Sequence, residues 1–483
     1  MIEKNYTIAI VGGGIAGLSA AYHLQMKINE GSNPFSYVLV EKEERLGGTI
    51  ITETVDDFII EGGPDCFFSE KPAAIALCQK LGLHDHFLKT NEQHHHTFIL
   101  WKGKLHELPK GFMLLSPTSL SWFVKDSLIS PWGKLRMAMD LVIPVKTSDK
   151  EESLAQFVER RLGKEVLEKI AEPLVAGIHA CNPETMSLKS TFPRFIELEH
   201  QYGSVIRGIM KRRKQLLRNK KEGSSHSQYT MFMTLKEGLT ELINALTATL
   251  NQAAIIAGTG VVSIEKTAKS DHSPPGFLIK LANGKSIEAQ AVVLATPSYI
   301  TAEIVKDMDR SLAADLASIP YVSTATVSLA YHRKDVLHPL DGFGFVIPRM
   351  ERRKIMASTW SSMKFPHRAP EDKLLIRCFV GGAQNEHLAV LNETEIVSLV
   401  QEELRDIMGI EAKPLFTKVY RWEKSMPQYT VGHWDKVKRI EAQLATHPGL
   451  FLSGSAYQGI GISDCIKSGE EAATRSLHYV LVL

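Results

Sequence analysis

The first forty residues alternate between apolar runs and polar turns in the order of a strand, a helix and a second strand. An apolar run over residues 6–11 ends at a glycine, and residues 18–24 are a predicted helix rich in Leu and Ala. A second apolar run, residues 37–40, ends on an acidic residue. This order predicts a β-α-β unit that belongs to a parallel sheet.

The turn between the first predicted strand and the helix is a run of glycines. Gly12 allows a sharp turn, Gly14 lets the backbone approach a pyrophosphate, and Gly17 lets the helix pack closely on the strand. The free N–H groups at the helix start then face the phosphates. Glu41, at the end of the second strand, accepts hydrogen bonds from a ribose and repels a 2′-phosphate. The segment predicts an adenine dinucleotide with a free ribose, and the alternative is a glycine-rich turn without a ligand.

The remaining pattern predicts an α/β chain. A helix is expected at 72–81, a hairpin at 97–108, and mainly helical structure from about 111 to 218. Strands return within 255–295, and a further strand at 324–330 and a helix at 393–408 follow.

Composition and charge narrow the class of protein. The chain has 483 residues, 44% of them hydrophobic and 23% charged, which suits two or three globular domains. A net charge of +2 gives no electrostatic reason to expect nucleic-acid binding. The basic run 211–214 is interpreted as a solvated helix end, with an anionic membrane surface as the alternative.

Cysteine usage and the lack of long apolar runs predict a cytoplasmic protein. The five scattered cysteines form no C-x-x-C pair, which favours reduced thiols over disulfides or a zinc site. The first strand begins by Tyr6, which leaves no room for a signal peptide. No run approaches the ~18 to 20 apolar residues of a membrane span. The chain is therefore expected to be soluble, as a monomer or homodimer, with peripheral contact at the inner face of the cell membrane as the alternative.

Two further glycine turns follow Glu41 closely. They are Arg45 to Gly48 and Glu61 to Pro64, separated by a short predicted hairpin. This arrangement resembles the two-domain FAD oxidoreductases, which include amine oxidases, phytoene desaturases and protoporphyrinogen oxidases. The resemblance implies FAD as the cofactor, with the first turn along its pyrophosphate and ribityl chain and the second beside the isoalloxazine ring.

Segments across the whole chain narrow the resemblance further. Residues 422–433, 449–466, 171–180 and 342–344 closely resemble the porphyrinogen oxidases, above all the soluble kind of Gram-positive bacteria. The resemblance implies a Rossmann-like FAD-binding domain with an interleaved α+β substrate-binding domain and a helical substrate or membrane-side domain. The expected division assigns 1–85, 226–297 and 416–483 to the FAD-binding domain, 86–225 to the substrate and helical domain, and 298–415 to the second part of the substrate-binding domain.

The resemblance also implies the cofactor site residue by residue. Relatives usually have Gly-Ala-Ser or Gly-Asn-Ser where this chain has Gly454-Ser455-Ala456, so a side-chain contact from Ser455 is left open. The expected FAD-binding residues are Gly12, Gly13, Gly14, Ile15, Ala16, Gly17, Glu41, Lys42, Arg45, Gly48, Thr49, Gly62, Gly63, Pro64, Asp65, Val261, Trp422, Gly454, Ser455, Ile460, Gly461 and Ile462.

The reaction implied is the six-electron oxidation of a porphyrinogen to a porphyrin in haem biosynthesis. Flavin N5 accepts hydride and O2 reoxidises the flavin with release of H2O2, so no catalytic side chain is expected. Coproporphyrinogen III is the first choice of substrate and protoporphyrinogen IX the alternative. Another amine oxidase, a carotenoid desaturase, and a non-catalytic flavoprotein or haem-pathway interaction partner are the remaining hypotheses.

The substrate is expected to need an apolar slot and cations for its propionates. Lys71 is the preferred propionate partner, against the alternative of an exposed lysine at a helix start. Phe343 and Phe345 are candidates to pack on pyrrole rings, against the alternative that they fill a core.

Two further segments are candidates for binding roles. Residues 94–96 are three histidines in a row, but successive strand side chains point to opposite faces, so no metal site is expected. Residues 112–145, with Trp122, Phe123, Trp132 and the Met137/Met139 pair, are interpreted as a helical core. A membrane-docking element is the alternative for this segment.

Overall fold

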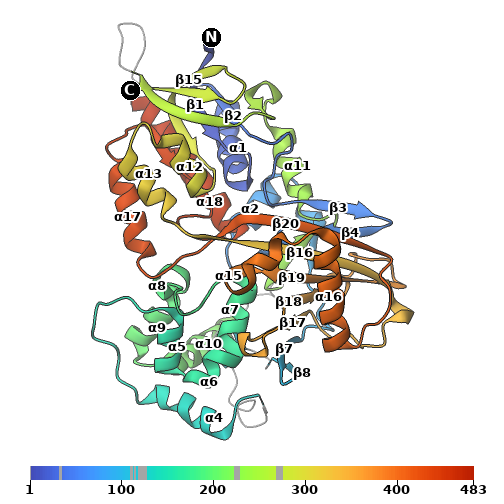
Figure 1. The fold of residues 1–483 in the computed structure, drawn as a ribbon. Helices are drawn as coiled ribbons and strands as arrows, with labels where there is room; N and C mark the ends of the chain where they lie inside the picture. The colour runs from blue at the N-terminus through green and yellow to red at the C-terminus, as the bar shows by residue number, and fades with distance from the viewer. Residues whose placement is uncertain are drawn as a thin grey trace.

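The structure is a computed structural model that describes residues 2–31, 35–108, 112–113, 116–117, 128–221, 229–267 and 276–482. The side chains of residues 2–4, 112–113, 116–117 and 216–221 are not described. Two bodies are stacked along the molecule, each built around a seven-stranded sheet, and both termini lie at the far end of the upper body (Figure 1). The chain crosses between the bodies several times, which confirms an interleaved α/β architecture.

The upper sheet combines strands from three distant parts of the sequence. Its order is β12-β2-β1-β15-β14-β13, with β21 also paired to β15. The pairs β12-β2, β2-β1, β1-β15 and β15-β21 are parallel, whereas β13, β14 and β15 form an antiparallel meander. The strands are β1 (Ile2–Val11), β2 (Tyr37–Val40), β12 (Ile255–Ile256), β13 (Val261–Thr267), β14 (Gly276–Leu281), β15 (Ser286–Leu294) and β21 (Leu450–Leu452).

Strand register brings four strand ends to one edge of this sheet. Val11 is paired with both Val40 and Leu294, and Leu294 is paired with Leu452. The residues that follow these four positions therefore emerge side by side, although they are hundreds of residues apart in sequence. In a parallel α/β sheet this carboxyl edge is where ligands bind.

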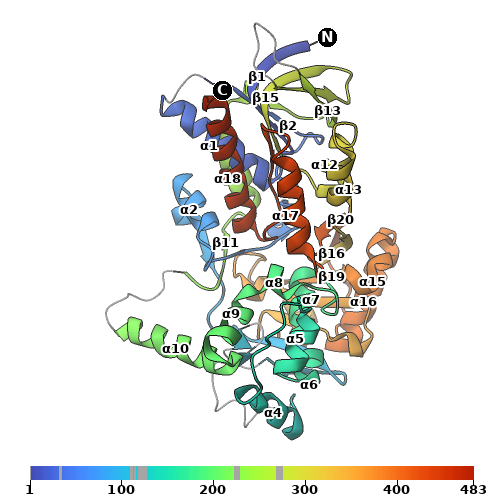
Figure 2. The ribbon, with the colours of Figure 1, turned by 90° about the vertical axis from the view of Figure 1, so that its left-hand side faces the viewer.

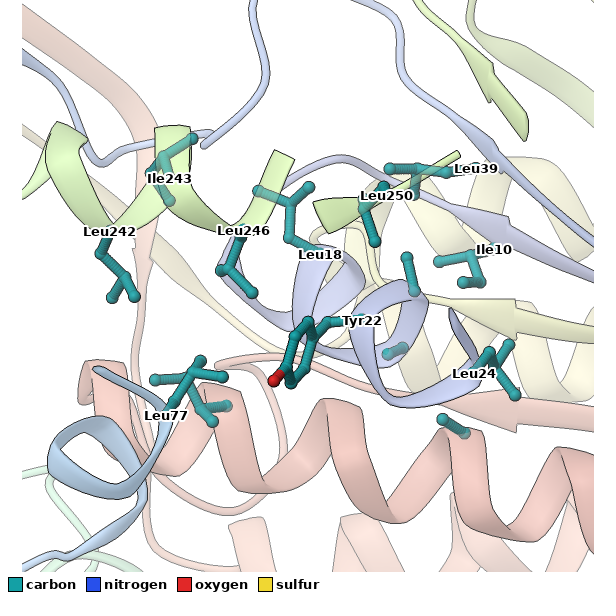
Figure 3. Close-up of a cluster of buried hydrophobic side chains, with 14 of the residues drawn as sticks. Ile10, Leu18, Tyr22, Leu24, Leu39, Leu77, Leu242, Ile243, Leu246 and Leu250 are labelled. Atoms are coloured by element: carbon teal, nitrogen blue, oxygen red, sulfur yellow. The ribbon is translucent and has the colours of Figure 1, made fainter. Parts of the chain in front are cut away.

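Alternate residues of β1 face two different hydrophobic cores. Ile8 and Ile10 pack with α1 (Ile15–Asn29), α2 (Ala73–Lys80), α11 (Thr240–Thr249) and α18 (Ile462–Val482), as the close-up of Leu18, Tyr22 and Leu246 shows (Figure 3). Ala9 and Val11 face the opposite core, to which α12 (Ser298–Val305), α13 (Arg310–Ala317) and α17 (His433–Leu444) contribute. The sheet is thus covered on both faces, as its continuous apolar strands require.

Helices α1 and α18 lie side by side (Figure 2), and a glycine at their contact allows the close approach. A Cβ atom on Gly469 would lie 2.2 Å from the carbonyl oxygen of Ala16. The last helix of the chain therefore packs directly on the first, and its N-terminus reaches the same sheet edge.

The lower sheet has the order β20-β16-β19-β18-β17-β7-β8. Its core includes Trp360, Ile376 and residues of α16 (Glu393–Met408), the helix predicted at 393–408. Because β20 is an edge strand of this sheet, residues 416–427 belong with the lower body and not with the cofactor part to which the expected division assigns them. The strands are β7 (Thr97–Trp101), β8 (Lys104–Glu107), β16 (Tyr321–His332), β17 (Gly344–Val346), β18 (Ile355–Trp360), β19 (Lys373–Gly381) and β20 (Phe416–Pro427).

Small sheets connect the two bodies. They consist of the hairpin β3 (Thr52–Val55) and β4 (Phe58–Glu61), and of β5 (Phe67–Phe68), β11 (Phe232–Leu235) and β6 (Phe87–Lys89). Short helical turns, α14 (Ser361–Lys364) and α15 (Gly382–Asn385), follow β18 and β19.

A helical unit occupies the bottom of the molecule. Arg161 and Asp140, both fully buried, form an ion pair at its centre, and Asp140 also accepts a hydrogen bond from Ser204. This network replaces apolar packing at that point. The unit begins with the strands β9 (Phe112–Met113) and β10 (Ser116–Pro117) and continues with α4 (Pro131–Ala138), α5 (Leu154–Arg161), α6 (Lys164–Val166), α7 (Glu172–His179), α8 (Leu188–Thr191), α9 (Pro193–Tyr202) and α10 (Val205–Lys221).

Cysteines and helix lengths complete the description of the fold. All five cysteines lie in the described part of the chain and are free thiols. Among the described residues, no helix combines the length and apolarity needed to cross a membrane.

Candidate functional site

The glycine run that follows β1 has the geometry predicted for it. Gly12 has φ +107°, and a Cβ on Gly17 would lie 1.9 Å from the carbonyl oxygen of Gly12. Gly14 differs, because no described atom lies within 4 Å of a Cβ built on it and its φ of −69° suits any residue. The protein therefore needs glycine at 12 and 17 for its own packing, whereas the space beside Gly14 is open and contact there with a pyrophosphate stays a prediction.

Glu41 lies beside this glycine run. Its carboxylate accepts a hydrogen bond from the backbone N–H of Gly13 and another, at 3.0 Å, from Glu43. The backbone of Glu41 accepts a hydrogen bond from Thr259 N at 3.1 Å, which places the start of β13 and Val261 nearby. The hydroxyl of Thr259 is buried without a hydrogen-bond partner among the described residues. Glu41 and the start of β13 therefore lie together beside the glycine run, at the end where the adenosine is expected.

The turn from Arg45 to Gly48 lies against the same glycines. Gly47 N donates to Gly13 O at 2.8 Å, and Gly47 and Gly48 both have positive φ. The Arg45 guanidinium donates to the carbonyls of Leu46, Gly48 and Ile50. Arg45 therefore shapes the turn, while Gly48, Thr49 and Lys42 are exposed at the site.

The Gly62–Pro64 turn packs on the preceding one. A Cβ on Gly63 would lie 1.7 Å from Thr49 O, so only glycine allows this approach. The carbonyl oxygen of Gly62 accepts hydrogen bonds from the indole N–H of Trp422 and the hydroxyl of Thr326, both at 2.9 Å. The lower sheet therefore holds the turn through β16 and β20, and a contact between Trp422 and the flavin stays a prediction.

A fourth turn, residues 454–461, follows β21 at the same sheet edge. Gly454 has φ +116°, and no described atom lies within 4 Å of a Cβ built on it. The hydroxyl of Tyr429 donates to Ser455 O at 2.6 Å and accepts from Gly459 N at 2.7 Å. Tyr429 thus fixes both ends of a turn that leads into α18, whose N-terminus begins at Ile462 just after Ile460 and Gly461.

Charged side chains are buried behind the Gly62–Pro64 turn. Asp65 forms an ion pair with Lys364 at 2.7 Å, and Glu61 pairs with Arg368 at 3.4 Å. Burial alone would raise the pKa of the Asp65 carboxyl, but Lys364 and Arg377 hold that pKa well below its usual range. Asp65 is therefore a carboxylate at neutral pH.

The three residues expected to bind the substrate differ in exposure and in their contacts. Lys71 is half exposed and pairs with Asp464, in the first turn of α18, at 2.6 Å. Phe345 is 1% exposed and packs on Trp360 in the core of the lower sheet, which favours the core-filling alternative. Phe343 is half-buried and stays a prediction.

The structure describes the histidine run 94–96 and part of the segment 112–145. In the histidine run, His94 pairs with Asp341 and His96 with Glu107. Trp122 and Phe123, from the candidate membrane element, lie outside the described residues.

Several residues at these turns are missed by sequence reasoning. Thr326, Arg377 and Tyr429 belong to the lower sheet or its connection, and only the folded chain brings them to the glycine turns. A usable signal exists for Arg377, since it is a lone charged residue within an apolar run, residues 374–380. Four glycine turns and two helix N-termini at one sheet edge fit an extended dinucleotide that carries a ring system at one end.

Comparison with known proteins agrees with this geometry. The family model of the flavin-containing amine oxidoreductases matches residues 15–477. The chain is 36% identical to the coproporphyrinogen III oxidase of Bacillus subtilis over 99% of this chain and 100% of that protein. It is 30% identical to the chloroplastic protoporphyrinogen oxidase of Oryza sativa, covering 98% and 88% of the two chains. A solved structure from Exiguobacterium sp. 255-15, provisionally named a protoporphyrinogen oxidase, superposes with a TM-score of 0.84 at 31% identity over all of both chains. The flavin cofactor expected from the glycine turns is thereby confirmed, and the chain belongs to the flavin-containing amine oxidoreductase family.

Proposed function

We propose that this protein is an FAD-dependent oxidase that converts coproporphyrinogen III to coproporphyrin III, with O2 as the electron acceptor. The observation that carries the proposal is the similarity to a coproporphyrinogen III oxidase over the full length of both chains. The match includes the lower sheet and the helical unit as well as the cofactor site. The lower sheet and the helical unit are the parts that would select a substrate.

The cofactor would extend across the carboxyl edge of the upper sheet. Glu41 and the start of β13 would hold the adenosine, and the glycine run with Arg45 to Gly48 would hold the pyrophosphate. The Gly62–Pro64 and 454–461 turns would enclose the ring. FAD would supply the hydride acceptor, so the task of the protein is to bind, orient and exclude water.

Lys71 is proposed to bind a propionate of the substrate. Its ammonium group already holds one carboxylate, that of Asp464, at the entry to α18. A second carboxylate from the substrate would share or replace this partner through a charge-assisted hydrogen bond. We expect Lys71→Met to raise the KM for coproporphyrinogen several-fold. The matched control is Lys80→Met, because Lys80 is similarly exposed and pairs with Glu470 further along α18. An unchanged KM in Lys71→Met refutes this assignment.

The substrate test compares two porphyrinogens that differ in charge. Purified holoenzyme is mixed in air with coproporphyrinogen III, which has four propionates, or with protoporphyrinogen IX, which has two propionates and two vinyl groups. Porphyrin fluorescence and H2O2 release are followed together. The proposal expects faster turnover of coproporphyrinogen III, and turnover of protoporphyrinogen IX alone would favour the second candidate, to which the Oryza sativa relative points. Anaerobic mixing that leaves the flavin oxidised with both substrates would exclude the oxidase function.

We also propose that α4 and the turn after it contact a membrane surface. Trp132 is 80% exposed and Val142 is 77% exposed, and Leu135, Met139 and Leu141 are exposed beside them. Helix α10, which includes the basic run 211–214, packs against the 139–141 turn. The exposed apolar residues, together with a basic run further along the helix that packs on them, favour an anionic lipid surface.

Sedimentation with phosphatidylglycerol vesicles tests this surface. The wild-type protein is expected to co-sediment at low salt, and Trp132→Ser is expected to reduce the bound fraction. Trp434→Ser is the control, since Trp434 is an exposed tryptophan of α17 in the upper body. Equal binding by the wild type and Trp132→Ser would contradict the assignment.

A further inference from the structure

One buried arginine reaches the Gly62–Pro64 turn from the central part of the lower sheet. The Arg377 guanidinium donates hydrogen bonds to the carbonyls of both Gly62 and Gly63. The carbonyl of Gly62 also accepts from Thr326 and Trp422, so donors from β16, β19 and β20 meet on one peptide unit. A carbonyl with three donors is more than the fold needs to satisfy one acceptor. The arrangement fixes the position of this turn against the lower sheet.

Arg377 forms no ion pair among the described residues, although its charge acts on the Asp65 carboxyl. Lys364 pairs with Asp65 and Arg368 pairs with Glu61, whereas no described carboxylate lies within 4.0 Å of Arg377. The three cations and two carboxylates of this group therefore leave one positive charge. Arg377 is only 3% exposed, so water screens its charge weakly.

The space beside Arg377 is too small for a polyatomic counter-anion such as a phosphate. The cavity lined by Glu61, Asp65, Ser328, Arg368 and Arg377 has a volume of about 10 Å³, which is the space of about one water molecule. The Nε atom of Arg377 is buried without a hydrogen-bond partner among the described residues. The uncompensated charge consequently acts towards the turn that Arg377 binds.

We propose that Arg377 is a positioning residue for the cofactor that also tunes its reduction potential. Its guanidinium holds the Gly62–Gly63 backbone in place beside the isoalloxazine ring and supplies a buried positive charge there. A flavin gains negative charge when it is reduced, so a nearby fixed cation favours the reduced form. This inference rests on the proposed placement of the flavin ring at the Gly62–Pro64 turn.

Three variants separate the two roles of Arg377. Arg377→Gln removes the charge and keeps an amide donor, and Arg377→Lys keeps the charge but cannot hold two carbonyls in the same way. The matched control is Arg421→Met on β20. Arg421 also has a side chain that donates to a backbone carbonyl, that of Leu391, but its position alternates with Trp422 and faces the other side of the sheet.

The readouts are the flavin midpoint potential, the FAD dissociation constant and the flavin absorption spectrum. The potential is measured by slow anaerobic reduction of each purified flavoprotein against a reference dye, without any porphyrinogen. The test therefore stays valid even if coproporphyrinogen III is not the substrate. Arg377→Gln is expected to shift the reduction equilibrium towards the oxidised flavin at least ten-fold, which is about 30 mV for a two-electron couple. Arg377→Lys is expected to keep the potential but bind FAD several-fold more weakly, and Arg421→Met is expected to change neither quantity.

Two results would overturn the inference. One is an Arg377→Gln protein whose flavin reduction equilibrium, calculated from the midpoint potential, stays within three-fold of the wild-type value. The other, which decides the matter if Arg377→Gln does not fold, is an Arg377→Lys protein with wild-type FAD affinity and an unshifted flavin spectrum.

Discussion

Gly14 and Gly17 are three residues apart in the same turn, yet the structure predicts opposite consequences when each is replaced by alanine. A Cβ on Gly17 would overlap the carbonyl oxygen of Gly12 at 1.9 Å, whereas a Cβ on Gly14 meets no described atom within 4 Å. Gly14→Ala should therefore leave the apoprotein folded. Its cost is that of changing the N-cap of α1 from glycine to alanine, about 0.5–1 kcal/mol.

The methyl group that Gly14→Ala adds would nevertheless occupy the space that the pyrophosphate needs. Forcing one extra methyl group into a packed contact costs about 1–3 kcal/mol, and 1.4 kcal/mol corresponds to ten-fold in affinity. We therefore expect Gly14→Ala to weaken FAD binding by about 5- to 150-fold. Gly17→Ala should instead lower the melting temperature of the apoprotein, because it separates α1 from β1.

The assay pairs two measurements on each apoprotein. Circular dichroism gives the melting temperature, and quenching of FAD fluorescence gives the dissociation constant. The reasoning is refuted if Gly14→Ala binds FAD within two-fold of the wild type, or if it lowers the melting temperature as much as Gly17→Ala does.

Three further outcomes are expected. Arg161→Met leaves Asp140 buried without its cation, so urea unfolding should show a loss of about 3–5 kcal/mol, and a loss below 1 kcal/mol would contradict this. Tyr429→Phe removes the hydroxyl that holds both ends of the 454–461 turn. FAD affinity should fall about 30-fold, because two hydrogen bonds of about 1 kcal/mol each are lost, with an unchanged circular dichroism spectrum, and an unaltered affinity would argue against this role. Because the pKa of Asp65 is lowered in the folded protein, its ion pair with Lys364 stabilises the fold fully above about pH 4, and this contribution declines as the pH falls further and the unfolded chain takes up the proton. Urea midpoints between pH 5 and pH 3 should therefore fall more steeply for the wild type than for Asp65→Asn, and parallel curves would exclude this linkage.

Local sequence predicts the parts of the site that depend on backbone shape. Gly12, Gly17 and Glu41 can be assigned from a strand, a turn and a helix, because each position has a steric or polar requirement set by its neighbours in sequence. The hairpin at 97–108 and the helix at 393–408 are predictable for the same reason.

The remaining parts depend on the pairing of distant strands. Arg377 reaches Gly62 only because β19 pairs with β16, and nothing in the local sequence sets that register. Phe345 shows the converse difficulty, since an aromatic residue on a strand has the same pattern whether it faces a substrate or a core. Strand β20 carries many partly exposed residues, so its place in the lower sheet leaves no apolar signal for a domain boundary.

The parallel pairing of β21 with β15, and the packing of α18 on α1, have a consequence for biosynthesis. The cofactor sheet lacks its last strand, and one wall of the proposed ring site, until residues 450–482 have left the ribosome. The nucleotide-binding half that begins the chain is thus completed only by its end. Ribosome-bound chains that stop before residue 450 should therefore retain little FAD, and chains that expose residues 450–482 should retain it.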